Sequence, residues 1–304
     1  MIPTYLRIVV TTDCSLKCAF CHMEGDPAQD GQRGGPSIDV LQSLVAAAYQ
    51  EGIRKFKLLG GEPLLRPDFP KLVAALRSVA PDGDLSIITA GVVPLHRLLE
   101  AFAAGLDRAN LSIHGWSPAM LARNARDPGA HAKRQRVLEA ILQHGAPLKC
   151  NYVYTGPEVE ADLQEFLAWS ADKPLVVSVL DNLGDAAMGP ATIKRVLQRL
   201  RGPWTKQWRE EDPRSLPTLR LQWADGLTVE IKDHQLGQIA PWKACNTCPE
   251  KAKCREGIFA LRLKHTGHAA PCMDRPDLNI ALIEVLAQGG VPAVRESWRK
   301  LMAA

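Results

Sequence analysis

The sequence lacks the features expected of a membrane-spanning, secreted or nucleic-acid-binding chain. No run of 18 apolar residues occurs in its 304 residues, so we predict no transmembrane helix. Residues 1–7 do not show the basic-then-apolar order of a signal peptide, and we therefore expect a cytoplasmic protein without membrane association. The net charge is only +4 and no basic stripe occurs, which argues against a nucleic-acid partner.

Cysteine is the unusual feature of an otherwise ordinary composition. Hydrophobic residues make up 46% and charged residues 23% of the chain, which is typical of a globular protein with a sizeable core. There is no internal repeat and no low-complexity tract. Eight cysteines in a chain without an export signal are more typical of metal ligands or catalytic groups than of disulfides.

Strand-like and helix-like segments alternate through most of the chain. This alternation is typical of an α/β fold with parallel strands. Six strand–helix rounds predict a partial (β/α)6 barrel of the TIM type, with its chemistry at the carboxyl ends of the strands. The predicted strands are residues 6–10, 55–59, 85–89, 108–113, 148–154 and 175–180, and the predicted helices are 37–50, 68–79, 94–105, 133–144 and 160–170.

The alternation breaks near Gly202, where several prolines follow. Trp204 and Trp208 are four residues apart, which favours a helix on which both side chains pack. Further on we predict strands at 219–223, 227–232 and 259–263, and a terminal helix at 291–302. We place a domain boundary near residue 215. The predicted units are a barrel at 1–215 and a small cysteine-rich, auxiliary iron–sulfur domain at 216–304.

A first cysteine group directly follows the first predicted strand. Cys14, Cys18 and Cys21 lie within eight residues and can converge on one metal centre. Three ligands leave a fourth position open, and on a four-iron cluster the open iron can bind a small molecule. A zinc knuckle or a group of buried thiols is the alternative interpretation of the spacing alone.

Two motifs together resemble the radical S-adenosylmethionine (SAM) superfamily. One is the Cys-x3-Cys-x2-Cys loop after strand one, and the other is Gly60-Gly61-Glu62-Pro63 at the end of strand two. The resemblance implies that SAM chelates the open iron of a 4Fe–4S cluster. Reduction of the cluster, by a donor such as flavodoxin or ferredoxin, then yields a 5′-deoxyadenosyl radical that abstracts a hydrogen from the substrate.

Several segments resemble the GTP 3′,8-cyclase group of molybdenum-cofactor biosynthesis more closely, over roughly residues 5 to 185. These segments are 5–14, 59–66, 89–91, 105–112 and 149–153. The resemblance implies that Gly61 and Glu62 lie against the SAM amino group and that Phe20 lies near the adenine. The full set of expected SAM contacts is Phe20, Gly60, Gly61, Glu62, Thr89 and Ser112, of which Thr89 is also a possible substrate contact.

A second cysteine group lies near the end of the chain. It comprises Cys245, Cys248, Cys254 and Cys272, a Cys-x2-Cys pair followed by two later cysteines, which is a strong metal signal. The spacing alone leaves zinc open. Beside a radical SAM core it favours an auxiliary 4Fe–4S cluster, and the spacing resembles the twitch and SPASM extensions of other radical SAM enzymes.

The chain also departs from the cyclase pattern. The cyclase has three auxiliary-cluster cysteines and binds substrate at the open iron, whereas four cysteines here allow full ligation. Alternatively, one of the four is a spare thiol that donates a hydrogen atom, as a radical epimerase needs. The cyclase ends in a Gly-Gly tail, whereas residues 301–304 read Leu-Met-Ala-Ala. We therefore expect a product other than the molybdenum-cofactor precursor.

Three basic residues occupy strand positions that match the triphosphate-binding positions of the cyclase. They are Arg7, Lys57 and Lys149. A charged side chain inside a barrel is costly unless it is paired. We predict that they bind an anionic group of the substrate. The alternative is that they pair with Glu62, Asp13 or the SAM carboxylate.

Strand alternation assigns further residues to the barrel interior. Lys149 and Asn151 share a face of strand five, so Asn151 is a substrate-binding candidate and Cys150, on the other face, is expected to be a buried structural thiol. His114 shares the face of Ser112. It is the candidate catalytic residue, either as a proton acceptor or as a hydrogen-bonding wall of the pocket.

The predicted function is that of a radical SAM enzyme in a biosynthetic pathway. Its substrate is a small, anionic, sugar- or nucleoside-like metabolite that undergoes epimerisation or dehydrogenation. The alternatives are a GTP 3′,8-cyclase-like cyclisation, peptide maturation, for which no peptide-binding segment is evident, and an iron–sulfur electron carrier. Residues 60–63 argue against the carrier, because electron transfer needs no clamp for an amino group.

Overall fold

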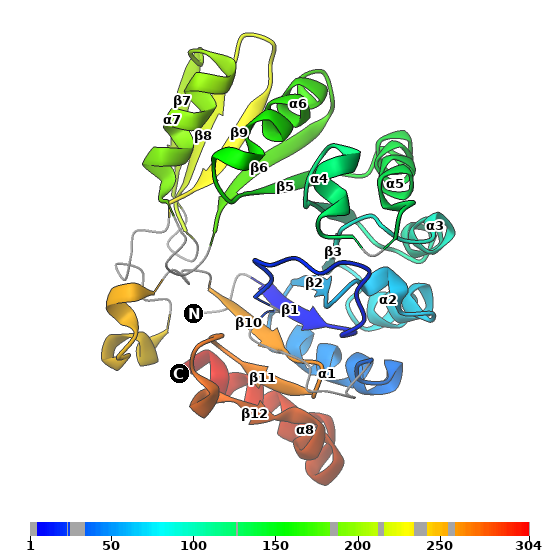
Figure 1. The fold of residues 1–304 in the computed structure, drawn as a ribbon. Coiled ribbons are helices and arrows are strands. Elements are labelled where there is room, and N and C mark those ends of the chain that lie inside the picture. The colour runs from blue at the N-terminus through cyan, green and yellow to red at the C-terminus, as the bar shows by residue number, and fades with distance from the viewer. Residues whose placement is uncertain are drawn as a thin grey trace.

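One continuous sheet organises the molecule. The computed structural model describes residues 5–22, 24, 34–125, 127–182, 188–211, 216–233, 242–254 and 259–303. Within these residues the strands form a single twelve-stranded sheet in the order β12-β11-β10-β1-β2-β3-β4-β5-β6-β9-β8-β7. The sheet curves into an open barrel with helices on its outside (Figure 1).

The middle of the sheet confirms the predicted partial (β/α)6 barrel. Neighbouring strands from β1 to β6 pair in parallel. These strands are β1 (Tyr5–Val9), β2 (Lys55–Leu59), β3 (Asp84–Thr89), β4 (Arg108–Ile113), β5 (Leu148–Tyr154) and β6 (Leu175–Asp181). The longer helices between them are α1 (Ile38–Gln50), α2 (Phe69–Val79), α3 (Leu95–Ala103), α5 (Ala130–His144) and α6 (Glu160–Ser170). Shorter helices are η2 (Pro63–Leu65), α4 (Pro118–Ala122) and η3 (Pro157–Val159).

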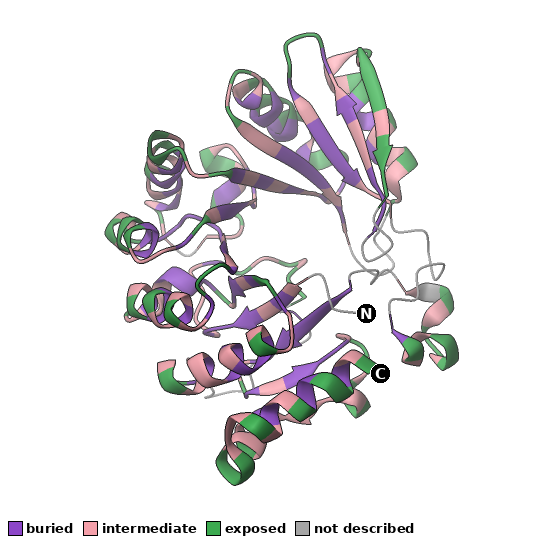
Figure 2. Cartoon of the chain, turned by 180° about the vertical axis from the view of Figure 1, so that it is seen from behind, coloured by how far each residue is buried: buried purple, intermediate pink, exposed green. Residues whose placement is uncertain are grey.

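Local signals explain why these elements begin and end where they do. The hydroxyl of Ser37 accepts a hydrogen bond from the Val40 amide and begins α1. Gly145, at φ 73°, ends α5 in the left-handed conformation that glycine adopts without strain. Along the strands, alternate side chains pack under the helices, and Figure 2 shows the inner strands largely buried, while the outer helix faces and one edge strand are exposed. Cys150 is fully buried on the helix side of β5, as predicted.

The sheet continues beyond the sixth strand, and one prediction there is wrong. Strand β9 (Thr228–Lys232) pairs in parallel with β6, and β8 (Thr218–Gln222) and β7 (Lys206–Glu210) follow as antiparallel neighbours. Trp208 lies in β7 and Trp204 in the loop before it, not on a helix. The reason is that α7 (Pro190–Arg201) ends at Gly202, whose φ of 75° and ψ of −167° turn the chain away before Pro203.

The other edge of the sheet is also extended. Strand β10 (Ala260–Leu263) pairs in parallel with β1, and β11 (His268–Ala270), η7 (Pro276–Leu278) and β12 (Ile280–Ala281) follow. Helix α8 (Leu282–Ala303) is broken at Gly290 and then runs as the predicted terminal helix. Its buried Trp298 donates from Nε1 to the carbonyl of Leu44 at 3.2 Å, which fixes α8 against α1.

The sheet runs across the expected domain boundary at residue 215, because β7 precedes that residue and pairs with β8 after it. Short helices η5 (Lys243–Thr247) and η6 (Lys251–Lys253) carry part of the second cysteine group. They lie between β9 and β10 along the chain and are drawn in gold in Figure 1. No helix in the described ranges is long and apolar enough to cross a membrane.

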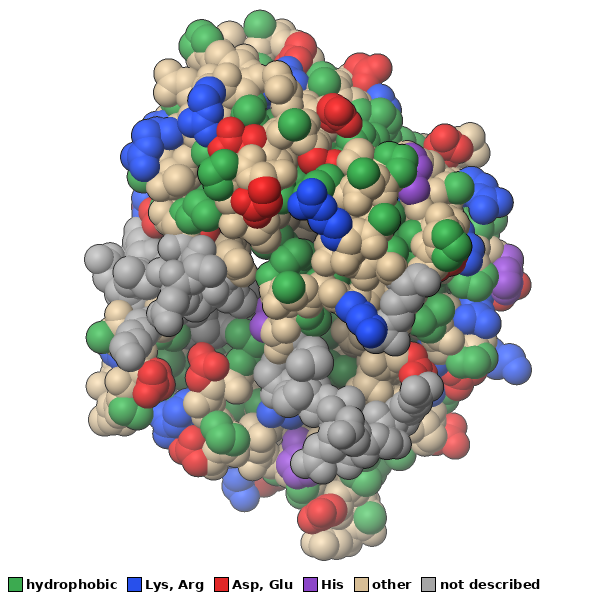
Figure 3. Space-filling model, in the orientation of Figure 1, with side chains coloured by type: hydrophobic (Ala, Val, Ile, Leu, Met, Phe, Trp, Pro, Cys, Tyr) green, Lys and Arg blue, Asp and Glu red, His purple; other side chains and the backbone are tan. Residues whose placement is uncertain are grey.

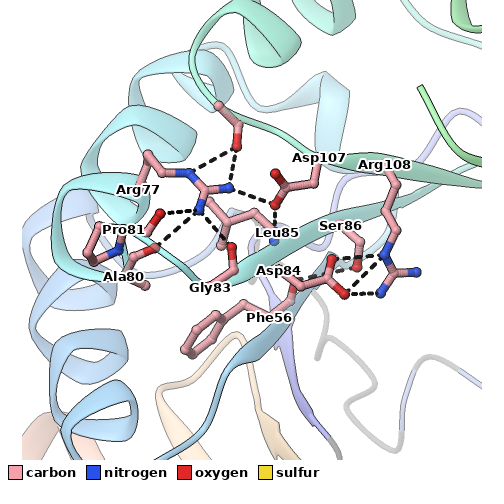
Figure 4. Close-up of polar contacts among 11 residues, drawn as sticks. Phe56, Arg77, Ala80, Pro81, Gly83, Asp84, Leu85, Ser86, Asp107 and Arg108 are labelled. Atoms are coloured by element: carbon pink, nitrogen blue, oxygen red, sulfur yellow. Dashed lines mark hydrogen bonds and ion pairs between the residues drawn. The ribbon is translucent and has the colours of Figure 1, made fainter. Parts of the chain in front are cut away.

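Two arginines fix the amino ends of β3 and β4 (Figure 4). Arg77, from α2, donates to four backbone carbonyls and to the carboxylate of Asp107. Asp107 in turn accepts from the Leu85 amide at 2.7 Å. Arg108 makes a bidentate ion pair with Asp84 on the neighbouring strand. These contacts close the base of the barrel, opposite the carboxyl ends where the motifs lie.

Candidate functional site

The glycine motif joins the loop after β2 to the loop after β1. The Gly61 amide donates to the Thr11 carbonyl at 2.8 Å, and the Glu62 amide donates to the Asp13 carbonyl at 2.6 Å. A Cβ atom would lie 2.2 Å from the Thr11 oxygen at Gly60, and 2.2 Å from the Asp13 oxygen at Gly61. Only glycine fits this approach. The motif therefore fixes the chain directly before the first cysteine.

Glu62 connects the same loops to the end of β3. The residue is 1% exposed, and its carboxylate accepts from the Thr89 hydroxyl at 2.8 Å and from the Ala90 amide at 2.8 Å. Burial raises the pKa of Glu62 to about 7, although these hydrogen bonds favour the ionised form. A buried carboxylate of this kind is stabilised by a cationic partner such as an ammonium group. Thr89 thus acts by orienting Glu62.

The first cysteine loop is held against the neighbouring strand ends. Buried Leu16 packs with Val92, which follows β3, and the Lys17 amide donates to the Asn124 carbonyl at 2.7 Å. The Cys21 amide donates to the Cys18 carbonyl at 3.1 Å, which turns the loop. All three cysteines therefore leave the carboxyl end of β1 within one short, anchored segment.

The chemistry of this donor set fits an iron–sulfur cluster. Burial, followed by the charges of Cys21 and Cys14, raises the pKa of Cys18 to about 12, because thiolates this close repel one another. A cationic metal centre removes that penalty. None of the eight cysteines, all in described segments, is in a disulfide. No three His, Cys, Asp or Glu side chains among the described residues converge on a single ion. In a four-iron cube each thiolate instead binds a different iron.

A cavity of about 600 Å³ opens beside Cys21. Phe20 and His114 form part of its wall, with ring centroids 5.3 Å apart. Burial, and then the charge of Arg134, lower the pKa of His114 to about 4, so the imidazole is neutral at pH 7. Its buried Nδ1 has no partner within the described ranges. A neutral, weakly basic imidazole suits a hydrogen-bonding wall better than a general base.

Residues not singled out in the sequence position the segment after β4. Asp162 accepts from the amides of Trp116 and Ser117, at 2.5 and 2.7 Å, and from the Tyr152 hydroxyl at 2.9 Å. Fully buried Arg134 donates to the carbonyls of Gly115 and Trp116. Asp162 and Arg134 are charged residues on the apolar faces of predicted helices. This pattern could have identified them, because a buried charge requires partners.

The basic interior residues have acidic partners that the sequence analysis did not identify. Arg7 makes a bidentate ion pair with Glu24, which is also 3.7 Å from Arg262. Burial alone would raise the pKa of Glu24, but Arg7 lowers it to about 2. Lys149 pairs with Glu230 of β9. Glu62, one of the predicted alternative partners, instead accepts from Thr89 and Ala90.

Lys57 makes no ion pair among the described residues. Burial, and then Arg7, Arg108 and Lys149, lower the pKa of Lys57 to about 7, and Glu24 opposes this shift. Its Nζ lies 4.8 Å from the centroid of the Tyr5 ring. An anion in the interior would restore the charge of this lysine. Figure 3 shows the molecular face hollowed near its centre, with charged side chains around the hollow.

The structure brings parts of the second cysteine group together. The Cys248 amide donates to the Cys245 carbonyl at 3.4 Å. Arg275, three residues after Cys272, pairs with Asp277 and contacts both the Ala244 carbonyl and the sulfur of Cys248, and the Asp277 and Cys248 contacts raise the pKa of the arginine. The Asp274 amide donates to the Cys272 sulfur at 3.4 Å. Cys254 follows η6, which contacts η5.

The family model of the radical SAM superfamily matches residues 8–170. The chain therefore belongs to this superfamily and is a radical SAM enzyme, which implies a 4Fe–4S cluster and SAM as cofactors. When bound, these supply the 5′-deoxyadenosyl radical. The residues assembled here, three thiols on an anchored loop beside a buried carboxylate and a cavity, fit that pair of cofactors.

Curated relatives match mainly the barrel. A probable GTP 3′,8-cyclase of Methanocella arvoryzae is 29% identical over 199 residues, 64% of this chain and 63% of its own. One from Aeropyrum pernix is 33% identical over 181 residues, covering 58% of this chain and 50% of its own length. Bovine molybdenum cofactor biosynthesis protein 1 is 32% identical over 183 residues, which cover 59% of this chain and 28% of that protein. The chain thus matches less than two thirds of each relative.

A solved structure supports the fold over nearly the whole chain. Streptococcus suis SuiB bound to the precursor peptide SuiA superposes with a TM-score of 0.65 at 16% identity, covering 97% of this chain and 67% of SuiB. The SAM-bound form of SuiB gives a TM-score of 0.62 over 90% of this chain and 61% of SuiB, again at 16% identity. At this identity the likeness concerns the fold alone.

The raised pKa of Glu62 predicts a pH-dependent stability in protein without SAM. The folded pKa of about 7 exceeds the unfolded value of 4.5, so the contribution of Glu62 is complete below pH 4.5 and lost as the pH rises through 7. Relative to Glu62→Gln, the free energy of unfolding should fall by about 3 kcal/mol across that range. Urea unfolding at several pH values measures it, and a pH-independent difference would contradict the burial argument.

The first cysteine loop predicts a loss of both iron and activity. Replacing Cys14, Cys18 and Cys21 together with alanine should abolish formation of 5′-deoxyadenosine from SAM and dithionite. Cys150→Ala is the matched control, because this thiol is buried on the helix side of β5 and should leave iron content and SAM cleavage intact. Reductive SAM cleavage that persists in the triple variant would exclude this loop as the cluster site.

Proposed function

We propose that this radical SAM enzyme abstracts a hydrogen atom from a small, anionic, nucleotide-like metabolite bound inside the barrel. The observation that carries the proposal is the position of Lys57, half-buried beside Arg7, Arg108 and Lys149 with its pKa lowered to about 7. The three neighbouring cations each have a carboxylate partner, whereas Lys57 makes no ion pair in the part of the chain that the structure describes, so a bound anion would supply its missing counter-charge. Asn151, on the same face as Lys149, borders this space.

In this proposal, residues at the carboxyl ends of the strands bind the cofactors. Cys14, Cys18 and Cys21 hold the 4Fe–4S cluster. Glu62 accepts a hydrogen bond from the amino group of SAM, and Gly60 and Gly61 present the backbone to it. Phe20 and His114, which form the aromatic wall of the cavity, also belong to the site. Thr89 on β3 and Ser112 on β4 complete it.

The names of the relatives make GTP the first substrate to test, with cyclisation as the reaction. Epimerisation or dehydrogenation is the second candidate, and the fourth cysteine of the C-terminal group favours it. A fully ligated cluster does not bind substrate through iron, and a spare thiol can donate a hydrogen atom. Product analysis separates these reactions. A loss of two mass units indicates dehydrogenation, whereas an unchanged mass with solvent deuterium incorporated indicates epimerisation.

We also propose that Cys245, Cys248, Cys254 and Cys272 bind a second, auxiliary 4Fe–4S cluster. The contacts of Arg275 support this proposal, because they bring the Cys245–Cys248 segment beside the segment that follows Cys272. The arginine places a positive charge near a thiolate, which stabilises the ionised ligand. An electron donor of the flavodoxin or ferredoxin type would supply the reducing electron.

Iron analysis tests the second cluster. Protein reconstituted without oxygen should contain about eight irons, as two four-iron cubes require. The Cys14, Cys18 and Cys21 triple variant should retain about half of them, because the second group is separate. Replacing the four C-terminal cysteines instead should remove the other half. Zinc in place of the retained iron would contradict the assignment.

The anion site predicts that Lys57→Met weakens the binding of GTP to the reconstituted enzyme by about ten- to a hundredfold, the value of one charge-assisted hydrogen bond. Lys55→Met is the matched control, because Lys55 lies on the same strand but is exposed. Wild-type affinity should also fall as the pH rises from 7 to 9, when Lys57 loses its proton. Equal affinities in both variants, measured by calorimetry, would exclude Lys57 as an anion ligand.

A further inference from the structure

Two buried polar side chains inside the barrel have no hydrogen-bond partner for one of their atoms among the described residues. They are Asn110 on β4 and Ser178 on β6, which are 5% and 0% exposed. The atoms are Oδ1 of the asparagine and Oγ of the serine. Because nearly all buried polar atoms in folded proteins are paired, two such atoms facing one interior are available to hydrogen-bond a ligand.

The strand geometry shows that both side chains face the barrel interior. Their chain neighbours all belong to the hydrophobic core between the sheet and the helices, and these are Ala109, Leu111, Val177 and Val179. Successive side chains on a strand point to opposite faces. Asn110 and Ser178 therefore point away from the helices, into the space that also contains Lys149.

Strand β5 lies between the strands of the two residues, and its interior-facing side chains form part of the site. Asn110 is in register with Lys149, and Ser178 is in register with Asn151. Ser112, the next interior position along β4, is in register with Asn151 and lies nearer the SAM end. A ligand that lies across the inner face of β5 would therefore contact both unpartnered atoms, with its anionic part toward the lysines.

The asparagine oxygen requires a hydrogen-bond donor from the ligand, and a hydroxyl group supplies one. An asparagine carbonyl oxygen only accepts hydrogen bonds, so an ionised phosphate or carboxylate cannot satisfy it. A hydroxyl group both donates and accepts, and it suits the serine as well as either end of an asparagine amide. Strands β4 and β6 are two spacings apart and the two residues are offset by two positions along them, so their backbones are about 12 Å apart. Both side chains point into the interior, where a five-membered sugar ring with hydroxyls on adjacent carbons can lie between them.

We infer that Asn110 and Ser178 bind the hydroxyl groups of a ribose-like ring and thereby determine the specificity of the site for its neutral, hydroxylated part. This inference rests on the proposed function, in which the basic residues around Lys57 hold the anionic part of the same substrate. Asn110 and Ser178, on the strands either side of β5, would recognise the ring, and the basic residues around Lys57 would recognise the charge.

The test compares GTP with 2′,3′-dideoxy-GTP on the reconstituted full-length enzyme by calorimetry. Wild type should bind the dideoxy nucleotide about three- to tenfold more weakly for each hydrogen bond lost. Ser178→Ala and Asn110→Leu should each bind GTP more weakly and discriminate less between the nucleotides. Ser86→Ala is the matched control and should discriminate like wild type. Ser86 is also a buried, interior-facing serine, but its hydroxyl donates to the Phe56 carbonyl at 3.4 Å.

The outcomes separate this inference from the proposed function. Variants that bind GTP and discriminate as strongly as wild type would overturn the ribose assignment and leave the anion site standing. A wild type that binds neither nucleotide would overturn both. Thermal unfolding of the unliganded protein adds an independent measurement. Ser178→Ala should leave the unfolding temperature unchanged, and a decrease as large as that of Ser86→Ala would mean that its hydroxyl already has a structural partner.

Discussion

The close contact between the loops after β1 and β2 is the constraint on which the site depends. Two backbone hydrogen bonds join Gly61 and Glu62 to Thr11 and Asp13, and no side chain fits between the backbones. The cysteine loop begins at the next residue, and the Glu62 carboxylate extends the connection to β3. A shift of this contact would displace the cluster ligands and the buried acid together. The close approach of the two loop backbones therefore determines the positions of the groups that would hold a cluster and SAM.

Charge organises the remainder of the interior. Glu24 and Glu230 neutralise Arg7 and Lys149 and keep them ordered without a ligand, while Lys57 makes no ion pair within the described ranges. Arg220 of β8 also pairs with Glu230, at 2.7 Å, so the added strands contribute to the wall of the barrel. The carboxyl ends of the barrel strands therefore suit the cofactors. The amino-end half of the interior and the inner face of β5 suit an anionic, hydroxylated molecule.

Much of the fold was predictable because its signals are local. Apolar periodicity, the Ser37 cap and the Gly145 stop are each read within a few residues, and the barrel strands and helices agree with those expected. The helix expected at Trp204 and Trp208 was wrong because a four-residue spacing also fits a strand preceded by a loop. What decided the outcome was the stop at Gly202 and the pairing of β7 with β8, in which Trp208 lies opposite Arg220, twelve residues further along the chain.

The sequence by itself determined the chemistry of the cofactor site, because its cysteine spacing and its Gly-Gly-Glu-Pro motif are short segments that each act as a unit. Only the tertiary structure decided how the interior charges pair and which polar atoms are left for a ligand. Glu230 meets Lys149 across 81 residues of chain, and Asn110 and Ser178 flank β5 only through strand register. Such relations depend on how strands align in the closed sheet, and no local pattern records that alignment.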